Sequence, residues 1–191
     1  VRSVRADFAP EIWDGLGTTP DPGMFTRSEM WIAVGVLIVN GSAILISDSR
    51  RAFFASLATC GCGMGLLAIA LLAQQAGMIS GFAFMVLIGL GLYLPYVAMH
   101  TTVFERMLGM TRERGNLGFL MYVADAVGYL GYVCVMLARN FSSSPHDLLG
   151  LTIVAGWFTV GISTVCLIQS GGYFWRWAST PKISPAVEGA T

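Results

Sequence analysis

Five long apolar stretches constrain the fold of this chain more than any other feature of its sequence. They contain none of its 11 Lys and Arg residues and only one of its 11 acidic residues. A helix rises about 1.5 Å per residue, so roughly 20 residues cross a hydrocarbon core about 30 Å thick. The stretches are Met30–Ser47, Ala52–Ala73, Met78–Phe104, Asn116–Ala138 and Leu148–Gln169. The sequence therefore predicts an all-α fold, a polytopic transmembrane bundle of five full spans.

The composition excludes several other classes of protein. Hydrophobic residues make up 55% of the 191 residues and charged residues 12%, and the formal net charge is zero. A soluble domain usually carries about 25% charged residues. The low charge argues against a disordered chain and an ordinary cytosolic enzyme, and the lack of net positive charge argues against nucleic acid as a partner.

The basic residues are distributed unevenly between the two ends of the predicted spans. One side collects seven of them, in the loops after the first and third stretches and in the C-terminal tail: Arg50, Arg51, Arg106, Arg112, Arg114, Arg176 and Lys182. Positive charge accumulates on the cytoplasmic side of membrane proteins. We therefore expect the 48–51 loop, the 105–115 loop and the C-terminus to be cytoplasmic.

The chain divides into a leading segment (1–29), the five-helix bundle (30–170) and a cytoplasmic tail (171–191). Val4, Phe8 and Ile12 recur at helical spacing in the leading segment. This pattern is typical of an amphipathic helix on the membrane surface, or of the outer end of a truncated span. Because the first residue is Val and no signal-peptide pattern follows it, we expect the chain to begin within a larger protein.

Polar residues inside the stretches indicate a candidate site. Asp125 is the one formally charged residue deep within a span, and an ionisable group at that depth faces protein or water, not lipid. The helical face of Asp125 also carries Tyr122 and Tyr129. The third stretch has a matching stripe of Tyr93, Tyr96 and His100, and an antiparallel arrangement puts Tyr93 near the depth of Asp125; Asn40 also falls near mid-depth.

These residues predict the polar, aromatic wall of a solute cavity: Asp125, Tyr122, Tyr129, Tyr93, Tyr96 and Asn40. The same tyrosines could instead bind Asp125 and lock two helices together, and the sequence leaves this alternative open. Glycines in two stretches predict close helix packing, namely Gly61, Gly63 and Gly65, and then Gly128 and Gly131. Pro95 predicts a kink in the third helix.

A family resemblance rests on the third and fourth stretches. The third ends Gly89-Leu90-Gly91-Leu92-Tyr93-Leu94-Pro95, and the fourth opens Arg114-Gly115-Asn116-Leu117-Gly118 and continues to Gly128-Tyr129-Leu130-Gly131. This pattern resembles helices ten and eleven of the major facilitator superfamily, and Asp48-Ser49-Arg50-Arg51 resembles its loop between helices eight and nine. On this register the chain covers helices eight to twelve, after the outer end of helix seven. The stretch from Tyr93 to Gly131 is also similar to an uncharacterised bacterial family of facilitator-like membrane proteins.

The resemblance implies the C-terminal part of a secondary active transporter that moves a small solute by alternating access. It also implies a cytoplasmic gate network of Asp48, Arg51, His100, Glu105 and Arg114. The alternative is a facilitator-like membrane sensor or scaffold that does not transport.

The partners implied are the lipid bilayer of a bacterial inner membrane, an N-terminal six-helix half of the same chain, and an unknown small solute with or without a proton. We expect no enzyme activity, cofactor or metal, because the sequence shows no catalytic Ser/His/Asp set, metal-ligand cluster or phosphate-binding loop.

Overall fold

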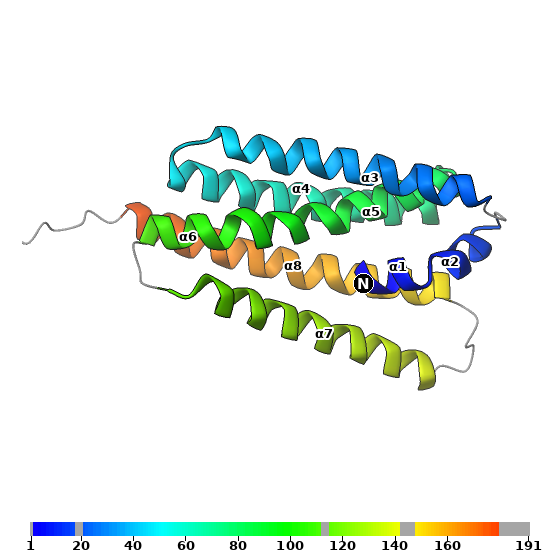
Figure 1. Ribbon diagram of the computed structural model, residues 1–191. Helices are drawn as coiled ribbons and strands as arrows, with labels where there is room; N and C mark the ends of the chain where they lie inside the picture. The colour runs from blue at the N-terminus through cyan, green and yellow to red at the C-terminus, as the bar shows by residue number, and fades with distance from the viewer. Residues whose placement is uncertain (1, 18–20, 112–114, 142–147, 180–191) are drawn as a thin grey trace, which may run out of the picture.

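The computed structural model describes residues 2–17, 21–111, 115–141 and 148–179, and these residues form helices and connecting turns without any strand. Figure 1 shows the elements lying side by side along one long axis. In chain order they are α1 (Arg2–Asp7), α2 (Ala9–Gly15), α3 (Pro22–Ser42), the 3-10 turn η1 (Ala43–Leu45), α4 (Ser49–Gln75), α5 (Gly81–Ala98), the π-helical turn η2 (Met99–Val103), α6 (Phe104–Thr111), α7 (Leu117–Phe141) and α8 (Leu148–Ser179). The predicted all-α class is confirmed for this part of the chain.

Among the described residues, four helices are long and apolar enough to cross a membrane. They are α4, the continuous helix Gly81–Thr111 built from α5, η2 and α6, and the segments Leu117–Leu137 of α7 and Leu148–Trp177 of α8. These four correspond to the second to fifth predicted stretches, and they indicate an integral membrane protein.

The first predicted stretch, Met30–Ser47, is also helical but differs in its limits. Its helix, α3, begins at Pro22, where Asp21 is extended and proline occupies the first turn, as is common at helix starts. Arg27 and Glu29 therefore fall inside the helix, and α3 ends at Ser42. The polar start and early end leave α3 outside the set of four candidate spans.

The ends of the helices separate into two groups (Figure 1). The connection between α3 and α4, the end of α6 and the end of α8 lie at one end of the bundle, and the turn between α4 and α5 lies at the other. At the first end, one pocket is lined by Trp175 of α8 together with Asp48, Arg50 and Arg51. The described parts of the basic regions predicted to be cytoplasmic thus share one end.

The most extensive helix contact joins α4 and α5, and two glycines allow the two helices to approach closely. A Cβ atom added at Gly63 would lie 2.7 Å from Cδ of Pro95, and one added at Gly91 would lie 2.9 Å from the backbone nitrogen of Leu67. Gly61 and Gly65, also predicted as packing residues, have open space around them. Residues two apart in a helix point in different directions, so one face cannot hold all three.

The main hydrophobic core forms where α4 and α5 meet the leading segment. Val4, Ile12 and Trp13 are fully buried, and Trp13 contacts the Phe25 ring edge-on at 6.2 Å between centroids. The buried core cluster comprises Ile12, Trp13, Met64, Leu67, Ala70, Leu71, Phe84, Met85, Ile88 and Leu92. The apolar face of the leading segment is thus packed into the bundle.

At the end of the bundle that holds residues 48–51, one helix contains a π turn and another is longer than predicted. After Pro95, which has no N–H for the helix ladder, the chain passes into the wider π turn of η2 before α6. Helix α8 continues to Ser179, past Gln169, because Phe174 and Trp175 pack edge-on against Phe53 and Phe54 of α4 at 5.0 and 5.6 Å. The predicted tail, 171–191, therefore starts as helix; residues 180–191 lie outside the described residues.

Helix α7 is the exception to this packing. Figure 1 shows it apart from the other helices, along one edge of the bundle. None of the apolar window that makes it a candidate span is buried, whereas 44% of the corresponding window of Gly81–Thr111 is buried. Gly128 and Gly131, predicted as packing residues, have open space where a Cβ would lie. Helix α7 therefore owes little of its position to apolar contacts.

Candidate functional site

A hydrogen-bonded pair of ionisable residues joins α7 to the rest of the bundle. Nε2 of His100, in the π turn η2, lies 2.9 Å from Oδ1 of Asp125 in α7. The side chains are 20% and 44% exposed, respectively. Both residues lie well inside candidate spans, at Gly81–Thr111 and Leu117–Leu137. The π turn and the α7 helix thus hold an acid and a base together inside the apolar region.

The partners of His100 fix the number of protons in this pair. Its Nδ1 lies 2.9 Å from the carbonyl oxygen of Tyr96, one turn earlier in the chain. A carbonyl oxygen only accepts, so Nδ1 carries a proton. The contact between Nε2 and Asp125 also needs a proton, either on the imidazole or on the carboxyl group. In this geometry the pair therefore holds one proton more than a neutral histidine and a free carboxylate.

A cavity of about 260 Å³ surrounds the pair and contains a third charged group, Arg2 of α1. The Cζ atom of Arg2 lies 4.0 Å from the centroid of the Tyr96 ring and 5.5 Å from that of Tyr93. A guanidinium over an aromatic face is attracted by the ring's quadrupole. The lining residues are Arg2, Ser3, Tyr96, His100, Ala124, Asp125, Gly128, Tyr129 and Tyr132.

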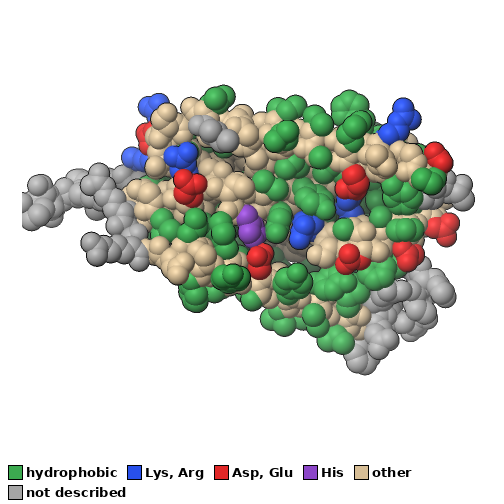
Figure 2. All heavy atoms as spheres, in the orientation of Figure 1, with side chains coloured by type: hydrophobic (Ala, Val, Ile, Leu, Met, Phe, Trp, Pro, Cys, Tyr) green, Lys and Arg blue, Asp and Glu red, His purple; other side chains and the backbone are tan. Residues whose placement is uncertain are grey.

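Figure 2 shows the face of the molecule on which these groups lie. A histidine side chain sits beside an acidic side chain, with a basic side chain close by and hydrophobic side chains around them. We name the residues lining this cavity the polar pocket.

The structure brings together only part of the predicted cavity wall. Asp125, Tyr96 and Tyr129 line the polar pocket, and Tyr93 contacts Arg2 at its edge. Tyr122 does not line the pocket, and 78% of its surface is exposed. Asn40 lies elsewhere, because α3 packs on α5 and not on α7.

Asn40 belongs to a second, larger cavity of about 600 Å³ between α3 and the α5–α6 helix. Its amide nitrogen donates to the carbonyl of Val36 at 3.2 Å. Glu105, predicted for the gate network, lines this same cavity. Asn40 and Glu105 therefore share a site to which Asp125 makes no contribution.

The predicted gate residues are distributed over three places. Asp48 accepts a hydrogen bond from the backbone nitrogen of Arg50 at 2.9 Å and lies 3.8 Å from Nε of Arg51, on the surface. His100 lies with Asp125 in the polar pocket, and no ion pair of Glu105 is found among the described residues. Arg114 lies outside the described residues.

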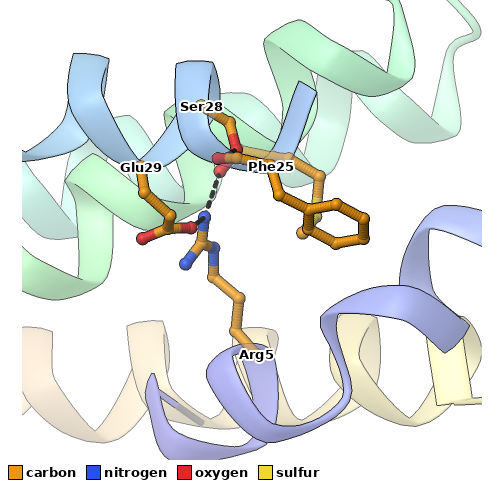
Figure 3. A network of polar contacts seen from close by, with 5 residues as sticks. Arg5, Phe25, Ser28 and Glu29 are labelled. Carbon is orange, nitrogen blue, oxygen red and sulfur yellow. Dashed lines mark hydrogen bonds and ion pairs between the residues drawn. The ribbon is translucent and has the colours of Figure 1, made fainter. Parts of the chain in front are cut away.

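Two arginines of the leading segment were missed as site residues. Arg2 lines the polar pocket, and Arg5 is buried between α3 and α5 (Figure 3). Their spacing of three places both on one side of a helix, and this was the available signal. Charged residues in an amphipathic segment usually face water, so this spacing alone does not distinguish a site residue from a surface charge.

Arg5 makes two hydrogen bonds from one nitrogen. Its Nη2 lies 2.7 Å from Oε1 of Glu29 and 3.2 Å from the carbonyl oxygen of Met85. The close view in Figure 3 shows Arg5 reaching from the leading segment toward Glu29 and Ser28 of α3. Gly89 makes room for it, because a Cβ there would lie 3.1 Å from Cζ of Arg5. Nε and Nη1 of Arg5 are buried without a partner among the described residues.

Comparison with known proteins yields one match. No curated protein and no solved structure matches the chain. A protein family described as "Family of unknown function (DUF5690)" matches residues 1–177, which include every helix that lines the polar pocket. The chain therefore belongs to this family of unknown function, DUF5690.

Proposed function

We propose that this chain is the C-terminal part of a secondary active transporter that moves a small solute across a bacterial inner membrane by alternating access. The observation that carries the proposal is the hydrogen-bonded His100–Asp125 pair in a cavity within two candidate spans. In this proposal α3 acts as a fifth span, and the chain supplies most of one half of a major-facilitator-like fold. The solute path would lie between this half and an N-terminal half.

The exposure of Asp125 supports transport over a purely structural role. A charged group deep in a membrane costs several kcal/mol on some scales, and such groups mark solute and proton paths. A dry contact, sealed from any cavity, would indicate that Asp125 only joins two helices. Instead, 44% of the Asp125 side chain is exposed, and the residue faces a cavity large enough for a small solute.

The bridging proton provides a way to couple the site to helix movement. Loss of that proton would leave the lone pair of His100 Nε2 facing the carboxylate of Asp125, and the contact would become repulsive. Backbone contacts of α7 are mainly with α6, and its apolar face is exposed. Deprotonation would therefore free α7 to move relative to α5, which is the kind of change alternating access requires.

The orientation in this proposal places the 48–51 loop, the 105–115 loop and the C-terminus in the cytoplasm. Single cysteines introduced at Ser49, Gly109 and Ser143 would be labelled with an impermeant maleimide in intact cells. We expect labelling at Ser143 alone. Equal labelling of all three would contradict the orientation.

The second candidate is a membrane sensor or scaffold without transport activity. The hydrogen bond between His100 and Asp125 also supports this candidate, since it ties α7 to α5. The two functions differ in one measurable respect. A transporter needs the carboxyl group of Asp125 to take up and release a proton, whereas a scaffold needs only the hydrogen bond.

The experiment uses full-length protein reconstituted into liposomes that contain a pH-sensitive dye. Panels of organic anions, amino acids, sugars and organic cations are added outside, and solute-dependent pH changes inside are recorded. We expect at least one class to produce a pH change with the natural protein, and none with Asp125→Asn. Asp14→Asn is the matched control, since Asp14 is exposed and lies outside the polar pocket.

The amide of Asp125→Asn keeps the size and a hydrogen bond to His100, so a scaffold would remain intact. Normal solute-dependent pH changes in this variant, with an unchanged melting temperature, would remove Asp125 from the mechanism. No flux of any solute through the natural protein would favour the scaffold.

A further inference from the structure

We infer that the polar pocket binds a small organic monoanion, a carboxylate held by Arg2, together with one proton held by His100 and Asp125. This inference rests on the proposed transport function and names its substrate class and its stoichiometry, one proton per anion. Three observations carry it: the surroundings of Arg2, the charge sum of the pocket and the chemical character of its walls.

Arg2 is oriented to receive an anion. Its contacts are with the faces of the Tyr96 and Tyr93 rings, and no acidic residue pairs with it among the described residues. An aromatic ring stacks on the flat face of a guanidinium and leaves the N–H groups at its edge free. These N–H groups can bind a carboxylate through two parallel hydrogen bonds. Asp125, the nearest acid of the pocket lining, is already bound to His100.

The contrast with Arg5 makes this clear. Arg5 lies three residues further along α1 and is paired with Glu29 at 2.7 Å. Its side chain is 1% exposed, so it offers no surface to a solute. Helix α1 therefore carries two arginines in different surroundings. Arg5 is paired with an acidic residue, whereas Arg2 faces a cavity and has no acidic partner among the described residues.

The charges of the pocket favour the joint binding of an anion and a proton. With its bridging proton, the pair has no net charge, so Arg2 leaves the pocket at plus one. A monoanion then brings the loaded pocket to zero. After anion and proton both leave, Arg2 and the carboxylate of Asp125 again sum to zero. Partly loaded forms carry a net charge, which is unfavourable in the low dielectric of a membrane interior.

Other charged and titratable groups near the pocket do not change this sum. From α5 they are Tyr93 and Tyr96, and from α7 Tyr129 and Tyr132. From α1 there is Asp7, which is exposed and interacts with the hydroxyl of Tyr132. Asp7 lies five residues from Arg2, about 7.5 Å along the helix axis at the usual rise. It therefore belongs to the rim of the pocket and not to the anion site.

The walls favour an organic anion of modest size. Rings of Tyr96, Tyr129 and Tyr132 offer apolar faces beside the guanidinium, and the hydroxyls of Tyr96 and Tyr129 offer hydrogen bonds. The cavity of about 260 Å³ is smaller than the roughly 300–1,000 Å³ of sites for drug-sized ligands. A dianion would leave the protonated pocket at minus one, and a neutral solute would leave Arg2 uncompensated.

The test measures binding by purified full-length protein in detergent, separately from transport. Melting temperatures are recorded with acetate, lactate, benzoate and nitrate, and with the neutral partners acetamide, lactamide and benzamide. We expect saturable stabilisation by at least one carboxylate and none by its amide. Arg2→Gln should abolish the effect, and Arg2→Lys should retain part of it.

The proton is tested by repeating the titration from pH 5.5 to pH 8.5. Binding of the anion should weaken as the pH rises, up to tenfold per unit once the pair loses its proton. In the double variant Asp125→Asn/His100→Gln the anion should bind with little dependence on pH, because neither amide can titrate. A natural protein whose carboxylate affinity is the same at all these pH values would overturn the coupling to a proton.

Failure of this inference is distinguishable from failure of the proposed transport. Stabilisation by amides as strong as by carboxylates, or by nitrate alone, would overturn the organic-anion site. Asp125-dependent flux of a neutral or cationic solute in liposomes would also overturn it, while leaving transport established. Carboxylate binding that depends on Arg2 and pH, without any flux, would uphold the anion site and refute transport.

Discussion

The two sides of α5 show two different ways of holding a helix in place. Toward α4, Gly63 and Gly91 let the backbones approach so closely that an added Cβ would lie within 3 Å of the neighbouring helix. Toward α7, the bond between His100 and Asp125 lies beside a cavity. Dense apolar contact has no alternative arrangement of similar energy, whereas a single protonated bond can be switched. The α4 side is thus suited to rigidity and the α7 side to movement.

The same contrast appears in the charges of α1. Arg5 is enclosed between α3 and α5 with Glu29, and Arg2 lies over tyrosine rings at the polar pocket. A buried charge with a fixed partner contributes to structure, and an accessible charge without one is available to a ligand. The following predictions test whether this division holds, from the largest expected effect to the smallest.

Removing the partner of Arg5 should give the largest loss of stability. Glu29→Gln leaves a buried cation without its counter-ion, and breaking such pairs typically costs about 3–5 kcal/mol. We expect an effect near the lower end, on the order of 3 kcal/mol, because Glu29 is 52% exposed. Unfolding by denaturant in mixed micelles would measure the change, with the exposed Glu11→Gln as control.

The double variant Arg5→Met/Glu29→Gln should recover most of this loss. Methionine fills a similar volume, and it removes the two buried Arg5 nitrogens that lack a partner. A double variant as unstable as Glu29→Gln alone would show that Arg5 is not the source of the penalty.

A methyl group on the dense side should cost somewhat less. Gly91→Ala brings a Cβ to 2.9 Å from the backbone nitrogen of Leu67, where no side chain can move aside. Overpacking of this kind costs typically 1–3 kcal/mol. Gly61→Ala, on the open face of α4, should be neutral or stabilising, because alanine favours helix by up to about 1 kcal/mol. Equal effects of the two substitutions would contradict the assignment of the packing face.

A substitution on the α7 side of α5 should change the free energy of unfolding only slightly. Asp125→Asn should change the free energy of unfolding by less than about 1 kcal/mol, since the N–H of the amide can donate to Nε2 of His100. Amide hydrogen exchange should nevertheless become faster in α7 and remain unchanged in α4 and α5. Faster exchange throughout the bundle would mean that α7 supports the core, and the contrast between the two sides would fail.

The smallest effect is expected at the surface pair of the 48–51 loop. Arg51→Ala should cost less than about 0.5 kcal/mol, because its contact with Asp48 is long and both side chains are exposed. Asp48→Ala should cost about 1 kcal/mol, because Asp48 also caps the start of α4.

A shift in the ratio of inward- to outward-open forms, measured by crosslinking in Arg51→Ala, would support the gate. An unchanged ratio would limit Arg51 to a role in orientation.

The sequence by itself determined the helices and their order. Apolar stretches free of Lys and Arg can form helices in a membrane, and each stretch that was predicted contains one. It also identified Asp125, because a single acid in such a stretch departs from the pattern around it. The limits of α3 and α8 were less certain: local packing, such as that of Phe174 on Phe53, decides where a helix stops.

The tertiary structure alone decided which polar groups meet. His100 and Asp125 are 25 residues apart, and Arg2 is farther still from both. The π turn after Pro95 and the packing of α1 on α5 set their rotation and depth, and neither follows from spacing along the chain. Asn40 shows the same limit, since spacing along the chain does not determine the side of α5 on which α3 packs. Helical periodicity defines a face within one helix, while the orientation of that face toward other helices depends on contacts distributed over the whole bundle.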